Sequence, residues 1–238
     1  SVVAVCDIGC RILSEHSVPT PGRDPEEIVD VLTAAAFRLL DGHRDRTLVW
    51  GGVATAARLT GPGRIDHDLL GWTDVPVTDL FADRLGVPFS VAPHVEAMAA
   101  AELLVGHETH RGTTLVVYGR EHLGSALVID GAVHQPRAGS PDLAHLPVGP
   151  TTYLDDRGAG LLDVVSDSAL VRAAALHGIS VSTVAELAAR ARHDATAEAI
   201  LVERATVLGG LVGIVSAITR PDSVVLCGQA FTDHPRYL

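Results

Sequence analysis

Short apolar runs alternate with helix-like segments along the whole chain, and this alternation restricts the fold more than any other feature. Residues 2–8 form a continuous apolar run that ends at Gly9, which is typical of a buried strand. Residues 24–27 read Asp-Pro-Glu-Glu, a capping Asp followed by Pro and early acids, which indicates a helix start. We expect that helix to end near Gly42.

The same alternation continues to the end of the sequence. Further strands are predicted over residues 11–18, 47–57, 88–92, 113–118, 125–129 and 224–226, and further helices over residues 77–85, 95–105, 169–177, 184–192 and 195–220. Because strand–turn–helix units repeat in two halves, the fold class is predicted as α/β, with a mixed sheet flanked by helices in each of two lobes. His, Gly and polar residues cluster at 106–112, which places the lobes at 1–107 and 108–238.

Composition excludes several classes of function for these residues. The chain has 238 residues with a net charge of −11, which disfavours direct contact with the phosphate backbone of a nucleic acid. It shows no signal peptide and no uninterrupted apolar run of about 18 residues, so neither export nor a membrane span is predicted. The three cysteines are too few and too unevenly placed for a disulfide framework, which favours a cytoplasmic protein, and Cys6 and Cys10 are expected in the core.

Seven segments, taken in chain order, resemble the ROK family (repressor, open reading frame, kinase). They are Asp-Ile-Gly at 7–9, Gly-Trp-Thr-Asp-Val-Pro at 71–76, and the segments 85–88, 97–102, 128–131, 144–148 and 225–228. The resemblance covers essentially the whole chain and implies the two-lobed actin-like ATPase (ribonuclease H-like) fold. The family divides into sugar kinases and transcriptional repressors. The repressors carry a DNA-binding helix-turn-helix ahead of the first strand, which lies outside this sequence.

The position that the resemblance assigns to the catalytic base has changed. Family kinases place an Asn-Asp pair after the strand that corresponds to 89–92, and the Asp takes a proton from the sugar hydroxyl. Here the pair aligns with Pro93 and His94. Pro93 has no side-chain donor for the sugar, and an imidazole differs from a carboxylate in geometry and charge. The sequence identifies no partner that would orient His94.

The turns that would bind phosphate also depart from the family pattern. Backbone N–H groups of Gly-rich turns cradle phosphates. After Asp7 and Gly9 the family continues with Gly-Thr, whereas this chain continues with Cys-Arg. The second turn retains only Gly119 and Gly124, and the Glu between them at 121 would repel a phosphate; Gly228 follows the last predicted strand. We therefore predict degenerate phosphate loops at all these positions.

The first of these departures has a second explanation. The resemblance implies a further strand between residues 7–9 and 11–13, so a segment is expected to be missing from this sequence after Gly9. The family also continues beyond Leu238, so the second lobe is expected to be incomplete.

Sugar contacts in the family come from a Glu-x-x-His pair and a later Glu. The resemblance places Asp142, His145 and Asp163 at these positions, with both acids one methylene shorter. The alternative is that these acids are ordinary loop and helix-start residues. Many relatives hold a zinc ion with His and three Cys, but here the thiolate positions align with Leu154, Asp156 and Leu161. No metal and no cofactor is therefore predicted.

These observations favour the effector-sensing and dimerisation part of a ROK-like transcriptional regulator without kinase activity. The resemblance implies that a sugar or related small molecule binds between the lobes, that DNA contacts are made by the helix-turn-helix outside this segment, and that the protein is a homodimer or higher homo-oligomer. One alternative is an ATP-dependent, glucokinase-like sugar kinase. Another is a scaffold that no longer binds a sugar.

Overall fold

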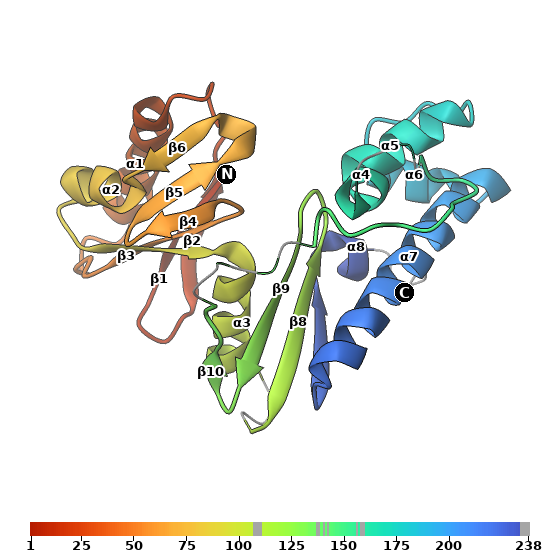
Figure 1. The fold of residues 1–238 in the computed structure, drawn as a ribbon. Helices are drawn as coiled ribbons and strands as arrows, with labels where there is room; N and C mark the ends of the chain where they lie inside the picture. Colours follow the sequence, from red (N-terminus) through yellow and green to blue (C-terminus); the bar gives the residue numbers. More distant parts are fainter. Residues whose placement is uncertain are drawn as a thin grey trace. The chain divides into compact units, whose positions relative to one another are not determined.

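The computed structural model describes residues 1–106, 111–136, 139, 141, 143–155, 157 and 160–233. The chain divides into two compact units, Ser1–Glu108 and Thr109–Leu238. In Figure 1 the first unit runs from red to yellow and the second from green to blue. Each unit has its own cluster of buried side chains.

The strands of the first unit form three small sheets. The hairpin of β1 (Val2–Cys6) and β2 (Ile12–Ser17) is antiparallel, and β3 (Gly51–Thr55) pairs in parallel with β7 (Phe89–Pro93). The third sheet is an antiparallel meander of β4 (Arg58–Gly61), β5 (Arg64–His67) and β6 (Trp72–Val75), with a 3-10 turn, η1 (Asp68–Leu70), before β6.

The prediction of one mixed sheet in this unit was therefore wrong. The sequence prediction placed no strand between residues 57 and 88, a stretch that includes Gly-Pro-Gly at residues 61–63. In the structure these three residues turn β4 back onto β5, and Gly63 has a φ of +73°, the left-handed region that favours glycine. Residues 58–75 thus pair among themselves and form a separate sheet.

Three helices complete the first unit. Helix α1 (Pro25–Asp41) starts as predicted, because the Asp24 carboxylate accepts the N–H of Glu27 at 3.0 Å. Helices α2 (Val77–Leu85) and α3 (His94–Val105) follow β6 and β7. The guanidinium of Arg84 on α2 holds α1 through Asp30 at 2.5 Å and through Glu26. The core between these elements contains Ile28, Val29, Ala57, Ile65, Trp72, Val77 and Phe81.

The second unit contains the mixed sheet that the sequence predicted. Strands β8 (Thr113–Gly119) and β9 (Leu123–Ile129) form the predicted antiparallel hairpin, and β10 (Ala132–Val133) extends it. Strand β11 (Ser223–Cys227) pairs in parallel with β8, giving the order β10-β9-β8-β11. Asp130 and Gly131 turn β9 into β10 with φ values of 48° and 80°, as an Asp-Gly hairpin turn requires.

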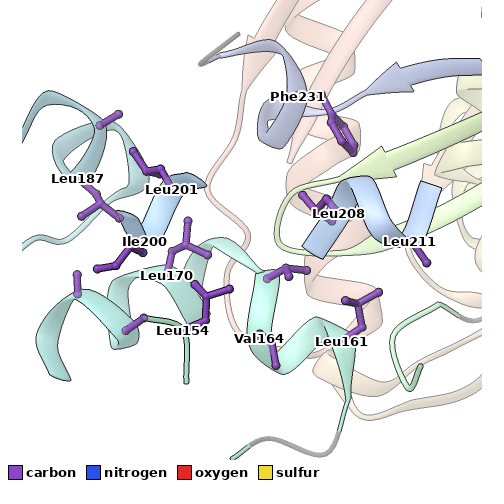
Figure 2. Close-up of a cluster of buried hydrophobic side chains, with 14 of the residues drawn as sticks. Leu154, Leu161, Val164, Leu170, Leu187, Ile200, Leu201, Leu208, Leu211 and Phe231 are labelled. Atoms are coloured by element: carbon purple, nitrogen blue, oxygen red, sulfur yellow. The ribbon is translucent and has the colours of Figure 1, made fainter. Parts of the chain in front are cut away.

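The described part of the second unit contains the helices α4 (Leu161–Val165), α5 (Asp167–Leu176), α6 (Val184–Arg190), α7 (Ala195–Thr219) and α8 (Gln229–Thr232). Their apolar faces meet in one cluster, shown in Figure 2. Its labelled members are Leu154, Leu161, Val164, Leu170, Leu187, Ile200, Leu201, Leu208, Leu211 and Phe231.

Helix α7 is long and apolar enough to cross a membrane when judged by length and composition. No span was predicted from the sequence because no uninterrupted apolar run reaches about 18 residues. The core helix of a soluble protein meets the same criterion, which makes it weak evidence for a membrane. Leu201 and Leu208 on this helix lie in the core of the unit.

The prediction that Cys6 and Cys10 are core residues was wrong. Both are exposed. Cys6 is the last residue of β1, and Cys10 lies in the turn after it with a φ of 62°. The apolar run that suggested burial ends as the chain enters this turn, where no element covers the side chains.

Substitutions of two leucines on the same helix, Leu170 and Leu176, test the core of the second unit. Leu170 on α5 is fully buried, whereas Leu176 is 58% exposed. We expect Leu170→Ala to lower the free energy of unfolding by about 3 kcal/mol, because it leaves a cavity. Leu176→Ala is expected to change it by less than about 1 kcal/mol. Urea unfolding followed by circular dichroism measures both, and equal effects of the two substitutions would contradict the core described here.

Candidate functional site

His94 lies where two parallel strands end. Thr55, the last residue of β3, pairs with Pro93, the last residue of β7, and His94 then begins α3. In open α/β sheets ligands bind outside such carboxyl ends. The His94 Nδ1 atom lies 3.4 Å from the carbonyl oxygen of Thr55. This contact orients the ring, and the sequence analysis missed it because the two residues are 39 positions apart.

The turn at Asp7 and Gly9 is closed by its own carboxylate. Asp7 Oδ1 accepts the N–H groups of Gly9 and Arg11, each at 3.0 Å, and Oδ2 pairs with the guanidinium of Arg11 at 3.1 Å. The hydrogen bond from the Arg11 backbone is the main reason that the pKa of Asp7 is lowered. The N–H groups of Gly9 and Arg11 are therefore already engaged by a side chain of the turn itself.

The second predicted phosphate turn is a tight hairpin turn. Gly119 ends β8 and Gly124 lies within β9, opposite Tyr118, so only residues 120–122 form the turn. The Glu121 carboxylate accepts the Ser168 N–H at 3.0 Å and the Ser168 hydroxyl at 2.7 Å. It thereby occupies the N-terminus of α5, the part of a helix that attracts anions.

A buried arginine is paired with a partly exposed aspartate behind this turn. Arg204 on α7 is 4% exposed, and its Nη2 atom lies 2.8 Å from Asp167 Oδ1 at the start of α5. Asp167 Oδ2 also lies 3.5 Å from Nε of Arg120 in the turn. Burial lowers the pKa of Arg204, while the charge of Asp167 acts in the opposite direction. The charges around the turn are thus balanced by side chains of the chain itself.

Gly228 and Gly119 allow a close approach of two strand ends. A Cβ atom on Gly228 would lie 2.5 Å from the Gly119 carbonyl oxygen, and the residue has a φ of +89°. A Cβ atom on Gly119 would lie 3.0 Å from the ring of Phe231. Close packing therefore accounts for the presence of glycine at both positions.

The candidate sugar contacts lie on neighbouring segments of the second unit. The N–H of Leu162 donates to the Ala144 carbonyl at 3.0 Å, and the N–H of Leu161 donates to the Leu146 carbonyl at 2.9 Å. These bonds hold the backbone on both sides of His145 against the start of α4, which carries Asp163. Both side chains are exposed. Asp142 lies outside the described residues.

The aligned zinc positions have become part of the core. Leu154 and Leu161 are 6% and 3% exposed and lie in the cluster of Figure 2. Asp156 is outside the described residues. Among the residues that the structure describes, no three His, Cys, Asp or Glu side chains are grouped to hold a metal ion.

Glu203 on α7 holds the segment beside Leu154, and sequence reasoning missed it. Its carboxylate accepts three successive backbone N–H groups, from Thr152 at 2.7 Å, Tyr153 at 2.6 Å and Leu154 at 2.9 Å. An acid in the middle of an apolar helix was the available signal. Its partners lie about 50 positions earlier in the chain and could not be found from spacing.

The two units have the mixed α/β architecture of the actin-like ATPase fold, and solved structures confirm it. A crystal structure of a ROK family transcriptional regulator, a homologue of the E. coli MLC protein, matches with a TM-score of 0.81 and 19% identity, covering 99% of this chain and 64% of that one. A ROK family glucokinase from Streptomyces griseus, in complex with glucose and AMPPNP, matches with a TM-score of 0.78 and 22% identity, covering 98% of this chain and 83% of that one.

The ROK family profile matches residues 1–238, and the chain belongs to this family. Proteins named transcriptional regulators from Mycobacterium tuberculosis and Mycobacterium bovis are 38% identical to it over 253 residues. The match covers 99% of this chain and 57% of each relative, so the chain spans little more than half the length of these proteins.

Gly160 tests how tightly the candidate sugar-binding segments are packed. A Cβ atom at this position would lie 2.5 Å from the Ala144 carbonyl oxygen and 2.8 Å from the His145 Cα atom. We expect Gly160→Ala to cost about 2 kcal/mol of unfolding free energy, because both contacts are with backbone. Gly149→Ala is the matched control, since its Cβ atom meets nothing within 4 Å. Equal Tm values for the two variants in thermal melts would contradict this packing.

Proposed function

We propose that this chain is the effector-sensing and dimerisation part of a ROK-like transcriptional regulator, and that it has no kinase activity. In this proposal residues 1–107 and 108–238 form its two lobes, and a sugar or related small molecule is the effector. The named relatives are transcriptional regulators, which supports the first part. The likeness to a glucokinase keeps an ATP-dependent sugar kinase as the alternative.

The observation that carries the proposal is the changed second phosphate turn, where Glu121 stands between Gly119 and Gly124 and binds the start of α5. Its carboxylate engages the N–H of Ser168. A nucleotide phosphate would have to displace this carboxylate and would meet its negative charge. Phosphoryl transfer depends on such N–H groups to hold the phosphates and stabilise the developing charge, so this contact argues against it.

The base position adds a second argument against phosphoryl transfer. Pro93 has no side-chain donor for a sugar hydroxyl, and His94 Nδ1 faces the Thr55 carbonyl oxygen. That contact fits a ring that donates from Nδ1, which would leave its other nitrogen as the acceptor. An acceptor nitrogen can receive a hydrogen bond from a ligand hydroxyl, so His94 is proposed as an effector contact; as a base it would still lack a second turn of the family pattern to hold the phosphates.

The effector contacts proposed for the second unit are Asp142, His145 and Asp163. Carboxylates suit vicinal hydroxyls because each oxygen accepts hydrogen bonds. Effector binding would act by favouring one of two states of the protein, which is how a ligand changes DNA binding at a distance. Contact with DNA is assigned to a helix-turn-helix outside this segment, and the protein is proposed to be cytoplasmic and a homodimer or higher homo-oligomer.

A kinase assay tests the absence of catalysis. With Mg-ATP and glucose, mannose or N-acetylmannosamine, we expect ADP release no faster than without sugar, because the second phosphate turn and the base position both depart from the family pattern. A coupled ADP-release assay measures this. Sugar-dependent turnover that is abolished by His94→Ala and retained by His193→Ala, a substitution of an exposed histidine in the second unit, would establish the kinase alternative.

Thermal shift tests effector binding. A ligand that binds only the folded state stabilises it by about 2.7 kcal/mol at a concentration 100 times its Kd. From a panel of glucose, mannose, N-acetylmannosamine and sucrose, each with and without a 6-phosphate where one exists, we expect at least one to raise the Tm. His145→Ala and Asp163→Asn should remove the rise, and His193→Ala should keep it.

The panel also separates the proposal from a scaffold that binds no sugar. If no member raises the Tm of the unaltered chain, the sugar-sensing part of the proposal is wrong. A rise in Tm that persists in both His145→Ala and Asp163→Asn would contradict the proposed binding site. It would not contradict the proposal that the chain binds a sugar.

A further inference from the structure

We propose that Glu203 is a positioning residue whose carboxylate holds the backbone of residues 152–154. Through this segment it fixes the position of α4, the helix that carries Asp163. The position of this helix matters for the proposed function, because Asp163 is a proposed effector contact. The hold on the backbone itself does not depend on which effector binds, or on whether one binds.

The first step of the inference is the geometry of the carboxylate. One oxygen of Glu203 accepts the Thr152 N–H, and the other accepts the N–H groups of Tyr153 and Leu154, all between 2.6 and 2.9 Å. Charged acceptors form shorter and stronger hydrogen bonds than neutral ones. Because three successive N–H groups donate to one carboxylate, Glu203 anchors the segment.

The segment is fixed from two further sides. The Thr151 hydroxyl donates to the Leu154 carbonyl at 2.9 Å. Nε2 of His177, at the end of α5, lies 3.1 Å from the Tyr153 carbonyl oxygen, and the two rings lie 5.6 Å apart. Glu203 is the anionic member of this group and the one that reaches the segment from α7.

The second step leads from the segment to α4. Leu154, whose N–H binds Glu203, points its side chain into the cluster that contains Leu161 and Val164 on the buried face of α4 (Figure 2). Asp163 lies on the same short helix and is exposed. The start of this helix is bonded to the backbone on either side of His145. A displacement of Leu154 would therefore disturb the support beneath both proposed effector contacts.

Glu203→Gln tests the proposal at the three amides. Glutamine keeps the length of the side chain but replaces one acceptor oxygen with an NH2 group, which faces an N–H donor. We expect hydrogen exchange at residues 152–154, resolved by NMR, to become at least about tenfold faster, because bonds to a charged acceptor are lost. The amide proton resonances of these residues should also move upfield.

Glu186→Gln is the matched control. Glu186 also accepts a backbone N–H in this unit, from Ser182 at 2.7 Å. Its substitution should alter exchange near residue 182 and leave residues 152–154 unchanged. If Glu203→Gln leaves the exchange and shifts at 152–154 unchanged, or if Glu186→Gln accelerates them equally, Glu203 does not position this segment.

Sugar affinity is a separate readout. For a panel sugar that stabilises the unaltered chain, we expect Glu203→Gln to weaken binding at least about fivefold and Glu186→Gln to leave it unchanged. Unchanged affinity with faster exchange would contradict the link from the segment to α4. If no sugar binds the unaltered chain, the proposed sensing function fails, while the exchange measurement still decides the role of Glu203.

Discussion

Backbone N–H groups captured by the chain's own carboxylates are the interaction on which the functional interpretation of this structure depends. Asp7 closes the β1–β2 turn, Glu121 occupies the start of α5, and Glu203 anchors residues 152–154. Donors of this kind bind phosphate in proteins that use nucleotides. Once a carboxylate is bound there, an incoming phosphate can no longer accept that N–H group, and the negative charge of the carboxylate repels it. Under the proposed function, the actin-like fold is kept while phosphoryl transfer is lost.

The second unit shows how such a contact also stabilises the fold. Glu121 bonds to Ser168, Asp167 pairs with Arg120, and Arg204 reaches Asp167 from α7. A buried guanidinium is costly unless it is paired, so the hairpin turn, the start of α5 and the middle of α7 depend on one another. Membership of the ROK family and the relatives named transcriptional regulators are consistent with a scaffold that is kept for sensing.

Local patterns predicted the helices and the hairpin of the second unit well, because their determinants are close in sequence. Asp24 caps α1, and the strands predicted at 113–118 and 125–129 correspond to β8 and β9. The meander of β4, β5 and β6 was missed because its strands are short. The sequence signals in this stretch are mainly turn residues, which do not show which strands pair. Cys6 and Cys10 were misplaced because an apolar run does not say where the covering elements end.

The sequence by itself determined the α/β class and the family, since these depend on residue identity and order, and it led to the prediction that Pro93 and His94 stand where family kinases have an Asn-Asp pair. Only the tertiary structure decided which donors and acceptors meet. Thr55 and His94 are 39 positions apart, Glu121 and Ser168 are 47 apart, and Glu203 and Leu154 are 49 apart. A hydrogen bond requires two atoms within about 3 Å, and chain order does not set that distance for residues so far apart until strands and helices have packed.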